Sequence, residues 1–204
     1  MTAEQAHALT AAARRQACAA LGVGLMALIG RAAAQTATTG ADDRAAQPQP
    51  AAIGGASGPA PDFDLPQWDL ASNAPHPSLR LALETLRGRW VYLDFWASWC
   101  GPCRLSFPWM NRLVQRLPAD RLRVVAIGLD TRAEPMARFI AQLAPRFTVL
   151  WDARHATPPL YRVQAMPSSF LIDPAGRIVA SHRGFNPTDA SAIERDLRQR
   201  LGIA

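Results

Sequence analysis

The feature that most constrains this chain is a pair of cysteines, Cys100 and Cys103, that directly follows a dense apolar run. The run covers residues 90–96 and consists of strand-forming residues with one acid among them, which is typical of a central strand buried on both faces. Apolar residues at helical spacing follow the cysteines as far as Pro118. The pair is therefore predicted at the junction of a buried strand and a helix that begins near Cys100.

The spacing of the two cysteines indicates redox chemistry. Two intervening residues on the first turn of a helix bring two sulfur atoms within bonding distance, so the pair can alternate between a dithiol and a disulfide. Unpaired amides and the helix dipole favour a thiolate at the helix N-terminus, and we predict that Cys100 is the nucleophile. Cys103 lies one turn deeper, where we expect it to be shielded and to resolve the mixed disulfide formed with a partner protein.

A zinc half-site and a structural disulfide are the alternative interpretations of the pair. Zinc needs four ligands, and the chain has only one further cysteine, Cys18, far upstream. A disulfide that spans two residues closes too small a loop to stabilise the fold much. The histidines at positions 76, 155 and 182 are too widely spaced to suggest a ligand set. We therefore predict a redox pair with no metal and no cofactor.

The pattern downstream of residue 60 predicts one mixed α/β domain. A short edge strand is expected over 63–65, and the remaining predicted strands are 90–96, 123–130, 147–151, 168–172 and 178–185. Helices are predicted from near Cys100 to Pro118, over 135–143 and over 188–201. Strand–helix–strand–helix followed by a hairpin and a last helix predicts a mixed central sheet flanked by helices.

The charge of the chain is carried entirely by arginine on the basic side. The formal net charge is +6, and no lysine is present. The absence of lysine excludes Schiff-base catalysis, lysine general bases and the phosphate-binding P-loop. The arginines are scattered and often stand next to acidic residues, so no nucleic-acid partner is predicted.

The N-terminal residues have the layout of an export signal. Arg14 and Arg15 precede an apolar run over 17–29, and three alanines end at Ala34. The run is shorter than the ~20 residues that a membrane span needs. We predict a signal peptide over 1–34, cleavage after Ala34 and a periplasmic location. An uncleaved N-terminal membrane tether and a twin-arginine export route remain open.

Residues 35–60 are rich in Ala, Thr, Pro, Gly and Gln and contain almost no large apolar side chains. Such a segment cannot bury enough surface to offset the entropy lost on ordering it. We predict a disordered linker over 35–60 and a single folded domain over 61–204.

The segment from Asp94 to Cys103 (DFWASWCGPC) resembles the active-site segment of thioredoxins, and especially of the exported TlpA-like and ResA-like thiol-disulfide oxidoreductases. Residues 166–173 (MPSSFLID), followed by Gly-Arg-Ile-Val at 176–179, also match their pattern. The resemblance covers roughly residue 61 to the C-terminus. It implies a thioredoxin-like mixed central sheet flanked by helices, and thiol-disulfide exchange as the activity.

The resemblance implies a proton-transfer role for Asp94. This acid matches the buried thioredoxin aspartate that exchanges a proton with the resolving cysteine, and a lone buried carboxyl should have a raised pKa, which suits that task. The thioredoxin lysine near this aspartate has no counterpart here. ResA-like reductases dedicated to cytochrome c maturation carry a glutamate where this chain has Ser106, which weakens assignment to that pathway.

The resemblance also implies a surface that contacts substrate. Pro167 is expected to be a cis proline that faces the disulfide and leaves a backbone edge, with Met166, on which a substrate peptide can pair. Trp99, Gly101 and Pro102 around the nucleophile are expected to complete the substrate-binding surface.

These observations favour an exported thiol-disulfide oxidoreductase that reduces or exchanges disulfides in other exported proteins. Gly-Pro between the cysteines resembles the reducing thioredoxins, so an electron donor in the membrane is implied. A thiol peroxidase of the peroxiredoxin class is an alternative, disfavoured because no threonine lies between Trp90 and Cys100. A non-enzymatic module that binds Cu(I), or docks a partner, through the same two cysteines is another.

Overall fold

The computed structural model describes residues 58–203. The predicted signal peptide and residues 35–57 of the predicted linker lie outside the described residues. The last part of that linker contains a short strand, β1 (Gly58–Pro59), which pairs with residues 177–178. The described fold thus includes residues that precede the domain start predicted at residue 61.

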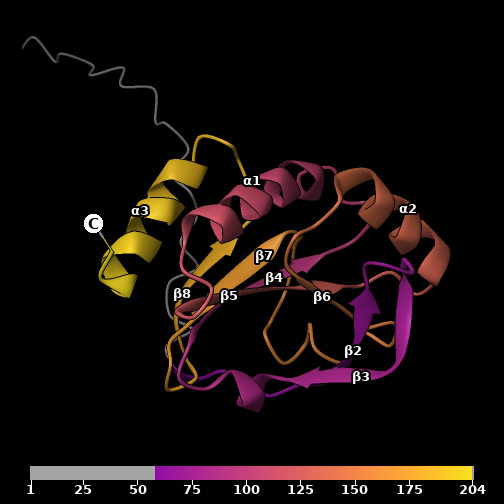
Figure 1. The fold of residues 1–204 in the computed structure, drawn as a ribbon, viewed down its shortest axis with the longest axis horizontal. Coiled ribbons are helices and arrows are strands. Elements are labelled where there is room, and N and C mark those ends of the chain that lie inside the picture. Colours follow the sequence, from indigo (N-terminus) through magenta and orange to yellow (C-terminus); the bar gives the residue numbers. More distant parts are fainter. Residues whose placement is uncertain (1–57, 204) are drawn as a thin grey trace, which may run out of the picture. The chain divides into compact units, whose positions relative to one another are not determined.

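The described residues form one mixed sheet, three α-helices and one short 3-10 helix (Figure 1). After β1, the elements in chain order are β2 (Asp64–Asp69), β3 (Ala74–Ala82), η1 (Leu83–Leu86), β4 (Trp90–Trp96), α1 (Cys103–Arg116), β5 (Leu122–Gly128), α2 (Ala133–Leu143), β6 (Thr148–Trp151), β7 (Ser168–Ile172), β8 (Arg177–Arg183) and α3 (Ala190–Leu201). The eight strands lie in the order β1-β8-β7-β4-β5-β6-β2-β3. Strands β4, β5 and β6 are parallel to one another, and every other pair of neighbours is antiparallel. The predicted mixed α/β sheet is therefore confirmed.

The longest element that sequence reasoning missed is β3, the strand at the edge of the sheet. It contains Pro75 and Pro77, and most of its side chains are exposed or only partly buried. Proline cannot donate to a strand ladder and is tolerated mainly at sheet edges, so the segment lacks the pattern of a central strand. Its partner β2 covers six residues in place of the three predicted over 63–65. The prediction that this strand lies at the sheet edge is wrong, because β2 pairs with β3 on one side and with β6 on the other.

The two faces of β4 contact different layers of the protein. Tyr92 and Trp96 face a core cluster that includes buried residues of α1, α2 and α3. Leu93 and Phe95 face a second cluster, built from residues 60–65, η1, Tyr161 and neighbouring strands. All three α-helices therefore cover one face of the sheet, as Figure 1 shows, while a short 3-10 helix and loops cover the other.

An aromatic cluster joins the sheet to the helices beneath the cysteine pair. The Phe107 ring in α1 lies 4.8 Å from the Trp96 ring of β4, 4.9 Å from Phe139 of α2 and 5.2 Å from Phe147, measured between ring centroids. Trp96 and Phe139 stack at 4.6 Å. Trp96 and Phe107 are fully buried. These rings fix the position of α1, and with it the cysteines at its N-terminus.

Phe107→Ala should lower the free energy of unfolding by about 3–5 kcal/mol, because it removes a fully buried ring and leaves a cavity among three aromatic neighbours. Leu105 lies on the same helix but is 52% exposed, so Leu105→Ala should change stability by no more than about 0.5 kcal/mol. Urea unfolding of the two variants measures both values. Equal effects would show that the aromatic cluster does not hold α1.

Candidate active site

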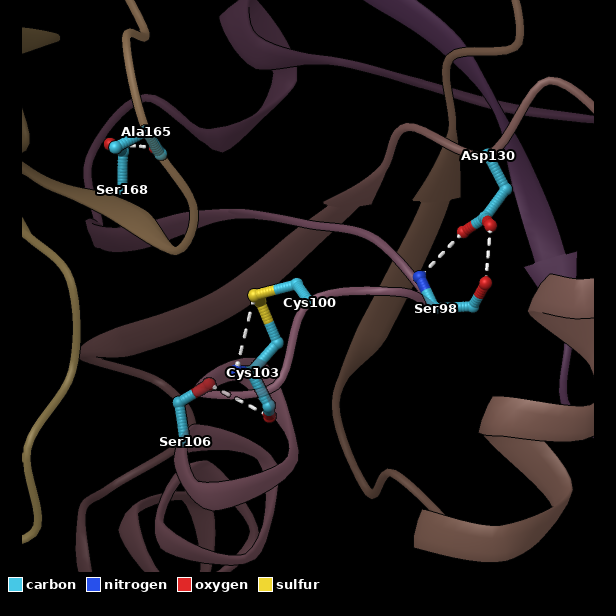
Figure 2. Close-up of a disulfide and its surroundings, with 7 residues drawn as sticks. All are labelled: Ser98, Cys100, Cys103, Ser106, Asp130, Ala165 and Ser168. Atoms are coloured by element: carbon cyan, nitrogen blue, oxygen red, sulfur yellow. Dashed lines mark hydrogen bonds between the residues drawn. A yellow bond between two sulfur atoms is a disulfide. The ribbon is translucent and has the colours of Figure 1, made fainter.

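The two cysteines form a disulfide immediately before and at the start of α1, as predicted for a redox pair (Figure 2). Their Cα atoms are 5.3 Å apart. The Cys103 side chain is fully enclosed, whereas Cys100 retains a small exposed area and lines a cavity open to the surface. This asymmetry agrees with the prediction that Cys103 is the shielded member of the pair.

The helix begins at Cys103 rather than near Cys100, because Pro102 is its N-cap residue and Gly101 lies in the turn before it. No side chain caps this helix with a nitrogen or oxygen acceptor. Instead, the Cys103 amide donates a hydrogen bond to Cys100 Sγ at 3.2 Å (Figure 2). The sulfur thus occupies the place of a capping acceptor, where the helix dipole and a free amide favour negative charge.

The loop before Cys100 is held by Asp130, which sequence reasoning did not single out. Asp130 follows β5 and is 5% exposed. Its carboxylate accepts hydrogen bonds from the Ser98 amide at 2.9 Å and from the Ser98 hydroxyl at 2.5 Å (Figure 2). The carboxyl ends of parallel strands meet at one edge of a sheet, and β5 is parallel to β4. An acid shortly after β5 could therefore have been predicted to lie near the loop that follows β4. Asp130 fixes the segment that presents Trp99.

A cavity of about 630 Å³ opens beside the disulfide. One wall is the turn around the nucleophile, and the other is the segment that precedes β7, which contributes His155, Pro158, Pro159, Val163, Gln164, Ala165 and Met166. Trp99, Cys100, Gly101 and Pro102 form the first wall, and Leu129 also lines the cavity. Four of the five residues expected to contact substrate therefore line one cavity with Cys100. We call this cavity the active-site groove.

Pro167, the fifth expected contact residue, directly follows Met166 but is not among the residues that line the cavity. The Met166–Pro167 peptide bond is cis, as the resemblance implied. Pro167 itself is buried, and its carbonyl accepts a hydrogen bond from the Gly184 amide at 2.7 Å. The Ser168 hydroxyl donates to the Ala165 carbonyl at 2.7 Å (Figure 2). These bonds hold the chain on both sides of Met166, and no hydrogen bond within residues 58–203 uses the Met166 backbone.

Asp94 is buried on the face of β4 that the helices cover, the face shared by Tyr92 and Trp96. It is 2% exposed, and its Oδ2 atom has no hydrogen-bond partner. Burial raises the pKa of the Asp94 carboxyl well above its ordinary value. The expected raised pKa is thus present, on the face against which Cys103 packs.

Ser106 occupies the position where dedicated cytochrome c maturation reductases carry glutamate. It is buried, and its hydroxyl donates to the Cys103 carbonyl at 3.1 Å (Figure 2). The position therefore supplies a local bond within α1 and no ionisable group near the disulfide.

Comparison with known proteins assigns a family to this fold and site. The model of the AhpC/TSA family matches residues 56–181. The chain belongs to the AhpC/TSA family. The match includes both cysteines, Asp94, Pro167 and the whole active-site groove, so the features described above lie inside the shared domain.

Several proteins similar to this AhpC/TSA-family chain are named for thiol-disulfide exchange. The thiol-disulfide oxidoreductase ResA of Bacillus thuringiensis (strain Al Hakam) is 32% identical over 100 residues, which are 49% of this chain and 58% of the relative. A structure from Chlorobium tepidum, provisionally described as a thiol:disulfide interchange protein DsbE, is 42% identical with a TM-score of 0.65 and covers 72% of this chain and 99% of its own. The chain therefore matches less than two thirds of the length of its ResA relative.

The thioredoxin-like fold is supported by a more distant structure. The thioredoxin domain of a Bacteroides vulgatus thiol-disulfide oxidoreductase is 17% identical, has a TM-score of 0.61 and covers 72% of this chain and 98% of its own. At this identity the likeness concerns the fold alone, and it agrees with the thioredoxin-like sheet implied by the sequence.

Residues 58–203 contain no group of three or more His, Cys, Asp or Glu side chains placed to hold a metal ion. No helix among the described elements is long and apolar enough to cross a membrane.

Asp130→Ala should lower the free energy of unfolding by about 1–3 kcal/mol, because the partly buried Ser98 amide and hydroxyl would lose their acceptor. Ser98→Ala removes only the hydroxyl bond and should cost about 0.5–1.5 kcal/mol. Urea unfolding of the oxidised proteins compares the two variants. If Ser98→Ala were the more costly change, the carboxylate would not be the group that holds the loop.

Asp94→Asn should stabilise the protein increasingly as the pH rises. A carboxyl with a raised folded-state pKa binds a proton more tightly in the folded state, so the wild type loses stability as the pH rises above the ordinary value of 3.8. Relative to Asp94→Asn, this loss should amount to about 1.4 kcal/mol per pH unit until the folded-state pKa is reached. Unfolding of both oxidised proteins between about pH 4 and about pH 8 tests the expectation. A constant difference across this range would contradict it.

Proposed function

We propose that this protein is an exported thiol-disulfide oxidoreductase that reduces or exchanges disulfides of other exported proteins through Cys100 and Cys103. The observation that carries the proposal is the disulfide itself, with Cys100 Sγ accepting the Cys103 amide at a helix N-terminus while lining the active-site groove. A structural disulfide would not need a nucleophile with this capping contact and this access.

In the reducing direction the reaction begins from the dithiol. The Cys100 thiolate attacks one sulfur of a client disulfide, the client S–S bond breaks, and one client thiolate leaves. Cys103 then loses its proton to Asp94, and its sulfur attacks Cys100 Sγ of the mixed disulfide. The second client thiolate leaves, and the Cys100–Cys103 disulfide remains. Two electrons pass from the protein to the client, and each client thiolate takes up a proton.

The active-site groove supports an extended polypeptide as the substrate. Its walls are mostly apolar, with prolines on the side opposite the nucleophile and Trp99, which is 70% exposed, at its rim. The Met166 backbone, which is held in place but uses no internal hydrogen bond, can pair with a client strand. Trp99, Gly101, Pro102, Met166 and Pro167 would thus position the client sulfur at Cys100.

Only the sequence pattern supports the proposed location and the proposed source of electrons. The signal-like residues 1–34 support export to the periplasm, either with cleavage or with retention as an N-terminal tether. A protein that reduces clients there must itself be reduced again, which supports an electron donor in the membrane.

Insulin reduction by dithiothreitol tests the proposed activity on the chain without residues 1–34. The wild type should accelerate precipitation of the insulin B chain, and Cys100→Ser should return the rate to that of dithiothreitol alone. Cys103→Ser should instead accumulate a mixed disulfide that mass spectrometry detects, because the attacking cysteine is retained and the resolving one is lost.

Failure of the wild type to accelerate insulin reduction would overturn the proposal. A saturable, peroxide-dependent oxidation of the thiols would then support a thiol peroxidase. Cu(I) binding that survives a competing thiol would support a copper-binding module built on the two cysteine sulfurs, since residues 58–203 contain no group of three or more His, Cys, Asp or Glu side chains placed to hold a metal ion.

A further inference from the structure

Three polar side chains lie side by side across the centre of the sheet. Strand register places Asp94 of β4 opposite Ser169 of β7, and Ser169 opposite His182 of β8. Directly opposed residues in antiparallel strands point to the same face, with Cβ atoms about 4.5–5.5 Å apart. On its other side Asp94 faces Ala126 of β5, so its polar neighbours lie only in the direction of β8.

Ser169 lies between two buried polar atoms that have no partner. These atoms are Asp94 Oδ2 on one side and His182 Nδ1 on the other. The Tyr92 hydroxyl donates to Ser169 Oγ at 2.8 Å, which leaves the Ser169 proton free to turn towards either neighbour. The Trp109 ring of α1 packs edge-on against Tyr92 at 5.5 Å and covers the row from the helix side.

Burial shifts the pKa of both His182 and Tyr92, two titratable neighbours of Ser169. Burial lowers the pKa of His182, and Arg200 of α3 acts in the same direction, while Asp196 and Asp189 oppose the change. Burial raises the pKa of Tyr92, and the nearby Asp94 raises it further, so Tyr92 stays protonated and acts as a fixed donor. Nδ1 of His182 is buried, but the residue as a whole is only partly buried, so part of it is in contact with solvent.

We propose that Ser169 and His182 form a proton relay that connects Asp94 with solvent. This inference rests on the proposed function, in which Asp94 exchanges a proton with Cys103. The Asp94 carboxyl gives its proton to Ser169 Oγ, while the Ser169 proton passes to His182 Nδ1. The imidazolium formed then loses its Nε2 proton to water. Asp94 is left as a carboxylate that can accept the Cys103 proton, and the reverse sequence reloads Asp94 when the disulfide is reduced. No electrons move in the relay.

The relay would remove the proton that burial favours on Asp94. Burial favours the protonated form of Asp94, so this group must lose a proton before it can act as a base for Cys103. The chain has no lysine that could assist this step. Among the described residues, the row through Ser169 is the polar path that strand register places beside Asp94.

The test follows the two cysteines separately in the full chain carrying the substitution Cys18→Ser, in which Cys100 and Cys103 are the only thiols. Reduced protein is mixed with the aromatic disulfide dithionitrobenzoate; attack by Cys100 releases the first coloured thiolate, and resolution by Cys103 releases the second. Ser169→Ala and His182→Ala should slow the second release by about tenfold, less than the ~100-fold or more that direct general acid–base catalysis provides. The first release should be unchanged, and Ser169→Thr, which keeps a hydroxyl, should retain the wild-type second rate.

Chemical rescue distinguishes a relay from a packing effect. Added imidazole should restore the second release in His182→Ala, because it can carry a proton where the side chain is missing, and should not restore it in Ser169→Ala. The matched control is His76→Ala in β3, at the opposite edge of the sheet, which should leave both releases unchanged with or without imidazole. If Ser169→Ala is unstable, His182→Ala with imidazole decides the test.

The outcomes separate the relay from the proposed function. If Asp94→Asn slows the second release but His182→Ala does not, the relay is wrong and the proton-transfer role of Asp94 stands. If His182→Ala is slow and imidazole has no effect on it, His182 acts through packing and the relay is also wrong. If Asp94→Asn has wild-type rates, both assignments fail, while insulin reduction still reports on the oxidoreductase activity by itself.

Discussion

Double-sided burial of β4 is the constraint on which the site depends. The strand is hydrogen-bonded to β5 on one side and β7 on the other, and all but its first residue are buried. Because its side chains alternate between faces, Trp96 anchors the helix layer, and Asp94 enters the same layer without a counterion. The chain then leaves the sheet with only a short loop before Cys100. A shift of one residue in this strand would exchange the two faces and remove both the aromatic anchor and the buried acid from the helix side.

At the active site, rigid surroundings hold an accessible sulfur, Cys100 Sγ. Phe107 and Trp96 fix α1, Asp130 fixes the preceding loop, and the bonds around Met166 fix the facing wall. Each of these contacts comes from a different part of the chain, so the geometry at Cys100 is held from several directions. The sulfur itself receives only one amide hydrogen bond from the helix, which leaves it free to exchange partners.

The sequence predicted those parts of the fold that have a strong local pattern. The buried strand 90–96, the cysteine pair, the second helix and the hairpin at Gly176 all follow from apolar periodicity or turn residues, and the structure contains them. Strand β3 was not predicted because its prolines and exposed side chains are typical of a loop. Sequence reasoning missed Asp130, Ser169 and His182 for another reason. The role of each depends on a neighbour that is distant in the sequence, and the pairing of distant segments cannot be read from one sequence. The resemblance to thioredoxins supplied the cis bond at Pro167, which composition alone would not have indicated.

The pairing of β1 fixes where the first described residue lies in the sheet. Gly58 lies opposite Ile178, Ile178 opposite Ile172, and Ile172 opposite Val91, so Gly58 is level with the beginning of β4. Cys100 follows the end of that strand. The length of β4, at about 3.3 Å per residue, therefore separates Gly58 from the reactive sulfur along the sheet.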